Sequence, residues 1–173
     1  MSLPHEPDAS LDQFFALHYK ELRQLAHRRL RRSERITLLD TTSLVHESYL
    51  RFLKARRISM SDHTQFVCFA ARVMRSIIVD FVRARRAECR GSGERATLHD
   101  EIAGPPSPED EIIRVNDALH ALAKVDGRLV KVVEMRYFGG LEEREIAESL
   151  GVTDRTVRRD WEKARLMLSL ALQ

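Results

Sequence analysis

The chain has 173 residues, of which 43% are hydrophobic and 32% are charged, a balance typical of soluble globular proteins. No apolar run approaches the roughly 20 residues that cross a bilayer, which argues against a membrane protein. The first ten residues have neither a basic start nor an apolar core, so they do not resemble a secretory signal and we expect a cytoplasmic protein. The two cysteines lack the spacing of a zinc site, which predicts reduced thiols, no metal and no cofactor.

The net charge of +3 is distributed unevenly along the sequence. Residues 1–88 include 16 Lys and Arg against 10 Asp and Glu, residues 89–112 include 2 against 6, and the remainder 11 against 10. A basic block favours the phosphate backbone of nucleic acids through counterion release, although it can equally be a solvated face without a partner.

Glycine and proline divide the sequence into long helical segments, because neither occurs between Pro7 and Gly91 and no proline follows Pro108. The stretch between Gly91 and Pro108 is polar and acidic, as expected of a flexible linker. Helical spacing of apolar and aromatic residues predicts three helices on one core before the linker. The spaced residues are Leu11, Phe15, His18, Leu22, Leu25 and Arg29, then Val45, Tyr49 and Phe52, then Phe66, Ala70, Val73, Ile77 and Phe81.

The helical period returns after the linker and ends at Gly139 and Gly140, a typical helix stop. No strand-like alternation is long enough to build a sheet. We therefore predict an all-α fold with two small helical domains, residues 10–88 and 112–173, joined by a flexible acidic linker at 89–111. The residues at helical spacing in the second domain are Ile112, Val115, Leu119, Leu122, Leu129, Val133 and Tyr137.

Residues 141–161 have the layout of a helix-turn-helix. Ile146 and Leu150 face the core, Ala147 allows a close helix crossing, Gly151 supplies the positive φ that ends the first helix, and Thr153 caps the second. The buried stripe of the second helix is Val157, Trp161, Ala164 and Leu168.

The opposite face of that second helix is densely basic, as expected of a helix that enters the DNA major groove. The alternative to DNA binding is an ordinary helical hairpin whose arginines are only solvated. The candidate DNA-binding residues are Arg155, Thr156, Arg158, Arg159, Glu162 and Lys163.

Three ordered segments identify a family. TSLVHESYLRF at 42–52, FAARVMRSIIVD at 69–80 and VVEMRYFGGL at 132–141 resemble signatures of the extracytoplasmic-function (ECF) sigma factors of bacterial RNA polymerase. The resemblance covers roughly residues 10–88 and 110–171. It implies a non-enzymatic subunit whose partners are core RNA polymerase, through the clamp of the largest subunit and the flap, and promoter DNA.

In such sigma factors the second helix of region two docks on the polymerase clamp. The resemblance assigns this role to Leu44, His46, Glu47, Tyr49, Leu50 and Arg51. Tyr49 is alternatively a core residue and His46 a plain surface residue.

The next helix and the loop before it would read the −10 element, with unstacked bases received by the loop and phosphates held by arginines. Phe66 is either a stacking platform or a core residue, and Ser76 stands where the family commonly has Asn. The residues implied are Ser59, Ser61, Asp62, His63, Gln65, Phe66, Arg72, Arg75, Ser76, Arg83, Arg85 and Arg86. The helix-turn-helix would then read the −35 element.

One departure from the family concerns the start of the clamp-binding helix, where an acidic run is common and this chain has Asp40 followed by Thr41, Thr42 and Ser43. Helix capping explains hydroxyls there. Alternatively, a phosphate would restore the missing negative charge. We hypothesise activation by a Ser/Thr kinase, with Thr42 the first candidate acceptor and Thr41 or Ser43 next, in place of release from an anti-sigma factor.

Other classes of function fit less well. His46-Glu47 lacks the second histidine of a zinc-protease helix, since position 50 is leucine, and no phosphate loop or nucleophile elbow is present. A helical adaptor that binds only proteins is another class. The remaining alternative is a stand-alone helix-turn-helix regulator that binds duplex DNA without polymerase.

Overall fold

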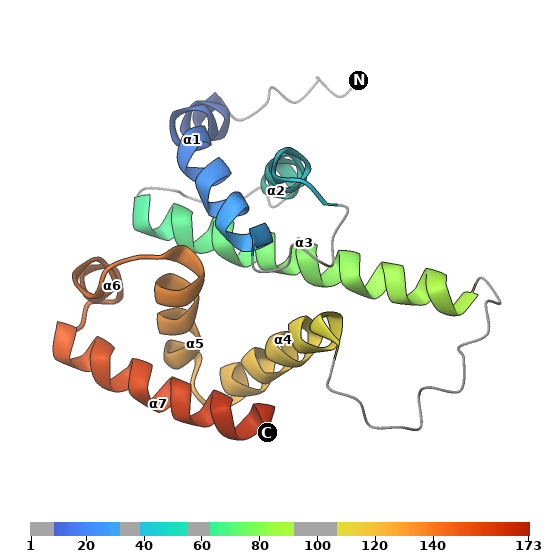
Figure 1. The fold of residues 1–173 in the computed structure, drawn as a ribbon. Helices are drawn as coiled ribbons and strands as arrows, with labels where there is room; N and C mark the ends of the chain where they lie inside the picture. The colour runs from blue at the N-terminus through green and yellow to red at the C-terminus, as the bar shows by residue number, and fades with distance from the viewer. Residues whose placement is uncertain (1–8, 32–38, 55–62, 92–106) are drawn as a thin grey trace, which may run out of the picture.

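The computed structural model describes residues 9–31, 39–54, 63–91 and 107–173 (Figure 1). Within these ranges the chain forms α-helices and one π-helical segment, and no strand. The predicted all-α fold is confirmed. None of the described helices is long and apolar enough to cross a membrane.

The N-terminal half consists of α1 (Ala9–Arg31), α2 (Thr41–Lys54) and α3 (His63–Gly91). These helices pack through the residues that the helical period singled out. Leu22, Phe52 and Phe66 are each at most 1% exposed, and the Phe52 and Phe66 ring centroids are 5.9 Å apart. The three predicted helices thus share one core.

The C-terminal half consists of α4 (Pro108–Val125), α5 (Gly127–Val133), the π-helical segment η1 (Glu134–Gly139), α6 (Glu143–Leu150) and α7 (Asp154–Leu172). A capping box between Ser107 and Asp110 starts α4, and Asp126 ends α4 and caps α5 through the Arg128 N–H. Leu119, Leu129 and Val132 are buried there, in a hydrophobic core that is continuous with that of the N-terminal half.

The helical spacing places Tyr137 on the same buried side as Leu129 and Val133. This prediction is wrong, because the Tyr137 side chain is 49% exposed. A stripe at α-helical spacing through Leu129 and Val133 would bury it. The π-helical turn adds a residue to that turn of helix and shifts the register of the buried side. Phe138 is buried in place of Tyr137.

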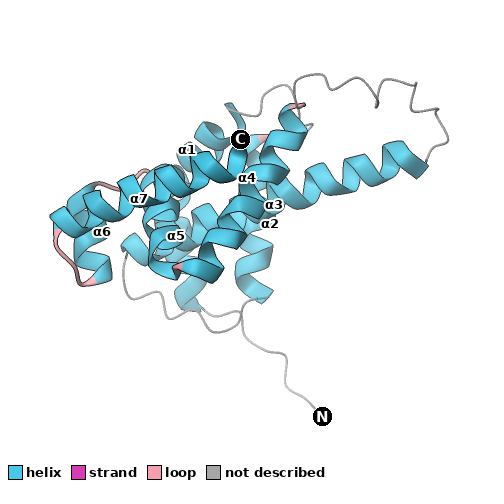
Figure 2. Cartoon of the chain, turned by 90° about the horizontal axis from the view of Figure 1, so that it is seen from below, coloured by secondary structure: helices cyan, strands magenta, loops and turns pink. Residues whose placement is uncertain are grey.

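The long helix α3 lies between the two halves (Figures 1 and 2). It contacts α1 and α2 on one side and α4, α6 and η1 on the other. Its C-terminal end extends beyond the other helices in both views. Helix α3 continues to Gly91 and α4 begins at Pro108, so both ends of the predicted linker are helical, while residues 92–106 lie outside the described ranges.

Candidate nucleic-acid interface

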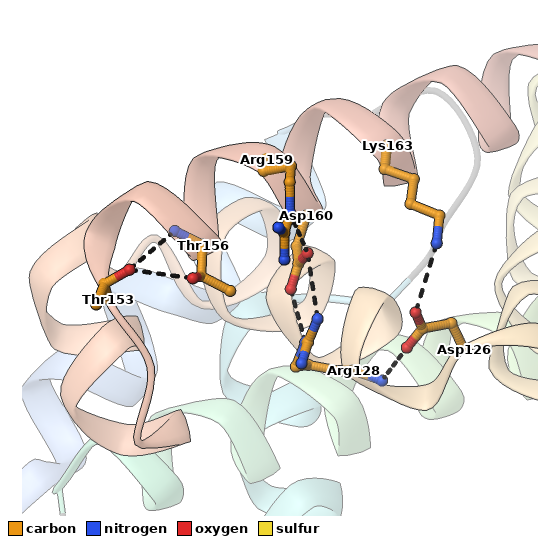
Figure 3. Close-up of polar contacts among 7 residues, drawn as sticks. All are labelled: Asp126, Arg128, Thr153, Thr156, Arg159, Asp160 and Lys163. Atoms are coloured by element: carbon orange, nitrogen blue, oxygen red, sulfur yellow. Dashed lines mark hydrogen bonds and ion pairs between the residues drawn. The ribbon is translucent and has the colours of Figure 1, made fainter.

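Helix α7 is held in a fixed orientation by the turn that precedes it. Gly151 has φ 64° and ends α6, as expected of a left-handed position that favours glycine. Thr153 Oγ1 accepts a hydrogen bond of 3.3 Å from the Thr156 N–H and caps α7 (Figure 3). Val157 and Ala164 are fully buried. These local features agree with the sequence prediction.

The outward face of α7 presents the predicted basic side chains. Arg155, Arg158, Arg159, Glu162 and Lys163 are exposed, whereas Thr156 is half-buried. Thr156 Oγ1 lies 3.0 Å from Thr153 Oγ1, so it belongs to the cap of the helix.

Three of these side chains are positioned by acidic neighbours. Arg158 Nε donates to Glu143 Oε2 on α6 at 2.6 Å, and this hydrogen bond lowers the pKa of Glu143. Arg159 Nε lies 3.7 Å from Asp160 Oδ1, and Lys163 Nζ lies 3.8 Å from Asp126 Oδ2 (Figure 3). All three basic side chains are more than half exposed, so such pairs are weak.

Asp160 is a buried residue that anchors α7 and that was not predicted from the sequence. Its carboxylate is 4% exposed and accepts hydrogen bonds from Arg128 Nε at 2.7 Å and from Arg128 Nη2 at 3.4 Å (Figure 3). The bidentate pair fixes α7 against the start of α5. Asp160 falls three residues after Val157 and four before Ala164, so its place on the buried stripe was the available signal.

Helix α2 divides the predicted polymerase-binding residues between two faces. His46 is exposed and Leu50 is 48% exposed, whereas Leu44 is fully buried, so its assignment to a docking surface is wrong. Glu47 Oε1 lies 3.7 Å from Arg51 Nε. Arg51 in turn donates to Ser76 Oγ at 3.0 Å and to Asp80 Oδ2 at 2.8 Å on α3.

Tyr49 is half-buried and packs on α1, with its ring centroid 4.8 Å from that of Phe15. Its hydroxyl donates to Asp12 Oδ1 at 2.5 Å, and this bond raises the pKa of Tyr49. The structure therefore favours the alternative that Tyr49 is a core residue, partly buried where α2 packs on α1.

The predicted base-reading residues are described only in part, because Ser59, Ser61 and Asp62 lie outside the described residues. Gln65 is exposed. Phe66 is fully buried between Phe52 and His18, which contradicts a role as a stacking platform.

His63 opens α3 and contacts α1. Glu21 Oε2 lies 2.8 Å from His63 Nε2 and 3.4 Å from His18 Nδ1. In the described part of the chain, these three side chains form the group whose donor atoms are close enough to hold a metal ion. Hydrogen bonds alone also account for the group, since a carboxylate can accept from both rings.

The five arginines predicted to contact −10 phosphates all have partners in the C-terminal half. The partners are Glu134 for Arg72 and Arg75, Asp117 for Arg83, Glu109 for Arg85, and Glu109 and Asp110 for Arg86. Glu134 and Asn116 are buried, and neither was predicted from the sequence. Their positions within apolar stripes are the sequence feature that could have predicted their burial. Glu134 follows Val133, and Asn116 lies four residues after Ile112.

The first turn of α2 contains the three candidate hydroxyls. Asp40 Oδ1 accepts from the Ser43 N–H at 2.9 Å and Oδ2 accepts from Ser43 Oγ at 3.0 Å, so these two residues cap the helix. The bonds from Ser43 lower the pKa of Asp40. Thr41 is half-buried and Thr42 is exposed.

The family model described as ECF sigma factor matches residues 6–173, which is nearly the whole chain. The chain belongs to the ECF sigma factor family. No curated protein and no solved structure matches it. Sigma factors are non-enzymatic subunits that bind RNA polymerase and DNA to initiate transcription, and this sigma factor is a member of that class.

Proposed function

We propose that this sigma factor binds core RNA polymerase through α2 and directs it to promoters whose −35 element is read by α7. The observation that carries the proposal is the outward face of α7, where Arg155, Arg158, Arg159 and Lys163 are exposed while Asp160 and Val157 anchor the opposite side. Helices α6 and α7 then act as a helix-turn-helix, with α7 in the major groove.

We propose a separate polymerase-binding surface on the exposed side of α2, with His46, Glu47 and Leu50 facing the clamp of the largest subunit. An exposed leucine beside a carboxylate and an imidazole suits a partner surface that is partly apolar and basic. The C-terminal domain is the proposed partner of the polymerase flap. We place the sigma factor and core RNA polymerase in the cytoplasm.

We propose that α3 and the preceding loop contact the −10 element. The support is the set of five arginines along α3, because guanidinium groups bind phosphates in a bidentate manner. With Phe66 in the core, base recognition falls to Gln65, His63 and the residues of the preceding loop.

The alternative, a stand-alone regulator that binds duplex DNA, predicts a different result in a direct test. The free chain and the chain with core polymerase are titrated separately against promoter duplexes selected from genomic DNA. Promoter-selective binding that needs core supports the proposal. Nanomolar, sequence-specific duplex binding by the free chain, without any stimulation of core, contradicts it.

We also propose that a Ser/Thr kinase activates the chain by phosphorylating the first turn of α2. That turn contains no acidic residue, and Thr42 is exposed there. A phosphate adds about 1.5 to 2 negative charges where the helix dipole favours an anion. Ser43 is the less suitable acceptor because its hydroxyl is bonded to Asp40.

The kinase proposal is tested by comparing unmodified, kinase-treated, Thr42→Glu and Thr42→Ala proteins for binding to core and for transcription. Phosphorylation is expected to increase core binding, with Thr42→Glu giving a smaller increase because its charge is lower. Full activity of protein from a kinase-free preparation, unchanged when Thr41, Thr42 and Ser43 are all replaced by alanine, rules out the switch and leaves an anti-sigma factor as the expected regulator.

A further inference from the structure

Two histidines and one glutamate come together where α1 meets the start of α3. Glu21 Oε2 lies 2.8 Å from His63 Nε2 and 3.4 Å from His18 Nδ1, and each of the three residues offers a ligand atom within 4.8 Å of the others. The centroids of the two imidazole rings are 5.0 Å apart. We call these three side chains the His–Glu–His cluster. Of the three, only His63 belongs to the proposed promoter-contacting residues.

The hydrophobic core beneath the His–Glu–His cluster fixes the backbone on which it stands. His18 and Glu21 are three residues apart on α1, so their side chains lie on the same face of that helix. Leu22, next to Glu21, is 1% exposed, and Phe66, three residues after His63, is fully buried. The His18 ring packs on Phe66, with ring centroids 5.3 Å apart. The fold thus brings the three side chains together without the help of a ligand.

The charge of the cluster favours a bound cation. In the part of the chain that the structure describes, the two imidazoles are the ion-pair partners of Glu21, and no lysine or arginine pairs with it, although Lys20 and Arg23 are its neighbours on α1. With both rings neutral, the cluster offers one carboxylate oxygen and two imidazole nitrogens as ligands. The negative charge of Glu21 is then balanced by no ammonium or guanidinium group.

The donor atoms and their spacing fit zinc. Zn²⁺ takes imidazole nitrogen and carboxylate oxygen, whereas Mg²⁺ and Ca²⁺ take oxygen ligands. Zinc–ligand distances of about 2.0–2.1 Å in a tetrahedron place neighbouring ligand atoms about 3.3 Å apart. The distance of 3.4 Å from Glu21 Oε2 to His18 Nδ1 already matches, and the distance of 2.8 Å to His63 Nε2 must open by about half an ångström. The Glu21 and His63 side chains are 38% and 43% exposed, which leaves them that freedom.

We propose that His18, Glu21 and His63 bind a zinc ion, with a water molecule in the fourth coordination position. Three protein ligands and one water is the coordination of open zinc sites. The ion replaces the hydrogen bonds of the cluster and joins α1 to the first residue of α3. The site goes beyond the proposed function and does not depend on it, because the free chain binds the ion.

Zinc occupies an atom that the proposed function gives to DNA. A metal-bound His63 Nε2 cannot also contact a base, so base recognition by the zinc-bound chain falls to Gln65 and the residues of the preceding loop. Cysteine spacing gave no sign of the site, because its ligands are imidazoles and a carboxylate from two helices. Glu21 and His63 are 42 positions apart in the sequence.

Titration of the full free chain with zinc chloride tests the site. All proteins have a Cys89→Ser background, because the exposed Cys89 thiol can itself bind zinc. One zinc ion is expected to bind per chain. Glu21→Gln and His63→Ala should each weaken binding by at least about tenfold, since even the loss of a second-shell partner typically costs about 10–100-fold. The matched control is His27→Ala, because His27 is an exposed histidine of α1 outside the cluster.

Glu21→Gln also distinguishes a zinc site from a cluster held by hydrogen bonds alone. Its amide oxygen can still accept a hydrogen bond from an imidazole, but it lacks the charge of the carboxylate ligand. Excess zinc should raise the thermal unfolding midpoint of the parent and of His27→Ala, measured by circular dichroism, and leave that of Glu21→Gln and His63→Ala unchanged. Cooperative unfolding of the variants in the absence of zinc shows that they are folded.

Cobalt identifies the ligands, because Co²⁺ can replace zinc and its visible absorption reports the coordinating atoms. We expect the spectrum of a tetrahedral ion with nitrogen and oxygen ligands and without a thiolate charge-transfer band. A thiolate band, zinc binding that survives both Glu21→Gln and His63→Ala, or no zinc binding at all overturns the site. None of these outcomes affects the proposed function, which fails instead if core polymerase with the chain gives no promoter-dependent transcript.

Discussion

Arg75 of α3 and Glu134 of η1 form an ion pair of 2.9 Å between residues 59 positions apart, and Arg75 also donates to Asn116 Oδ1 at 2.6 Å. One side chain thus joins the N-terminal half of the sigma factor to α4 and η1. Because Glu134 is buried, removing Arg75 would leave a desolvated carboxylate without its closest cation. Asn116 and Glu134 are thus the buried polar partners of Arg75 in the C-terminal half.

The recognition role of α7 predicts a specific mutational pattern. Arg158→Ala or Arg159→Ala should each reduce transcription from the cognate promoter by about tenfold, since one good base contact contributes roughly 1–3 kcal/mol. Binding to core should be unchanged. Arg165→Ala is the control, because Arg165 lies on the same helix, is 62% exposed and pairs with Glu162. A parallel loss of core binding, or equal effects of all three changes, contradicts the assignment.

The Arg128–Asp160 pair predicts a stability effect. Asp160→Asn should lower the free energy of unfolding by about 1–3 kcal/mol, because a buried carboxylate that accepts two hydrogen bonds from a cation is replaced by a neutral amide. Urea unfolding can be followed by the fluorescence of Trp161, the only tryptophan in the sequence. The exposed Glu148→Gln serves as the control, and a variant as stable as the wild type would show that the pair contributes nothing.

The sequence predicted the local features of α6 and α7 because each depends on a few adjacent residues. Gly151 and Thr153 end and begin helices through their own backbone and hydroxyl groups. The partners of Arg75 were not predictable in the same way, because a polar side chain on a helix has the same sequence pattern whether it faces water or another helix. Tyr137 was misjudged because a π-helical turn interrupts the 3.6-residue period.

The two cysteines should differ in reactivity. Burial raises the pKa of the Cys68 thiol to about 11, with a further contribution from the Glu134 carboxylate, whereas Cys89 is exposed. At about pH 8 the Cys68 thiol therefore stays protonated and unreactive. Iodoacetamide followed by peptide mass spectrometry should detect modified Cys89 well before Cys68, and denaturant should remove the difference. Equal rates in the native chain would contradict the burial of Cys68.

The start of α4 should weaken in acid. Hydrogen bonds from Ser107 and the contact with Arg86 lower the pKa of Asp110 to about 2, below its usual value of 3.8. A depressed folded-state pKa stabilises the fold above the unfolded value, and that contribution is lost as the pH falls from about 4 to about 2. The difference in unfolding midpoint between wild type and Asp110→Asn should therefore be constant from about pH 7 to pH 5 and shrink below pH 4. A difference that persists at pH 2 would contradict this account.

Run-off transcription is the most direct test of the role in initiation. Core RNA polymerase is incubated with fragmented genomic DNA, with and without the chain, and the 5′ ends of the transcripts are mapped. We expect a small set of new start sites that share −35 and −10 sequences. All of them should be absent with core alone, and Arg158→Ala or Arg159→Ala should each reduce transcription from them by about tenfold. An unchanged pattern of start sites with both the unmodified and the kinase-treated chain would contradict the assignment as a promoter-specific sigma factor.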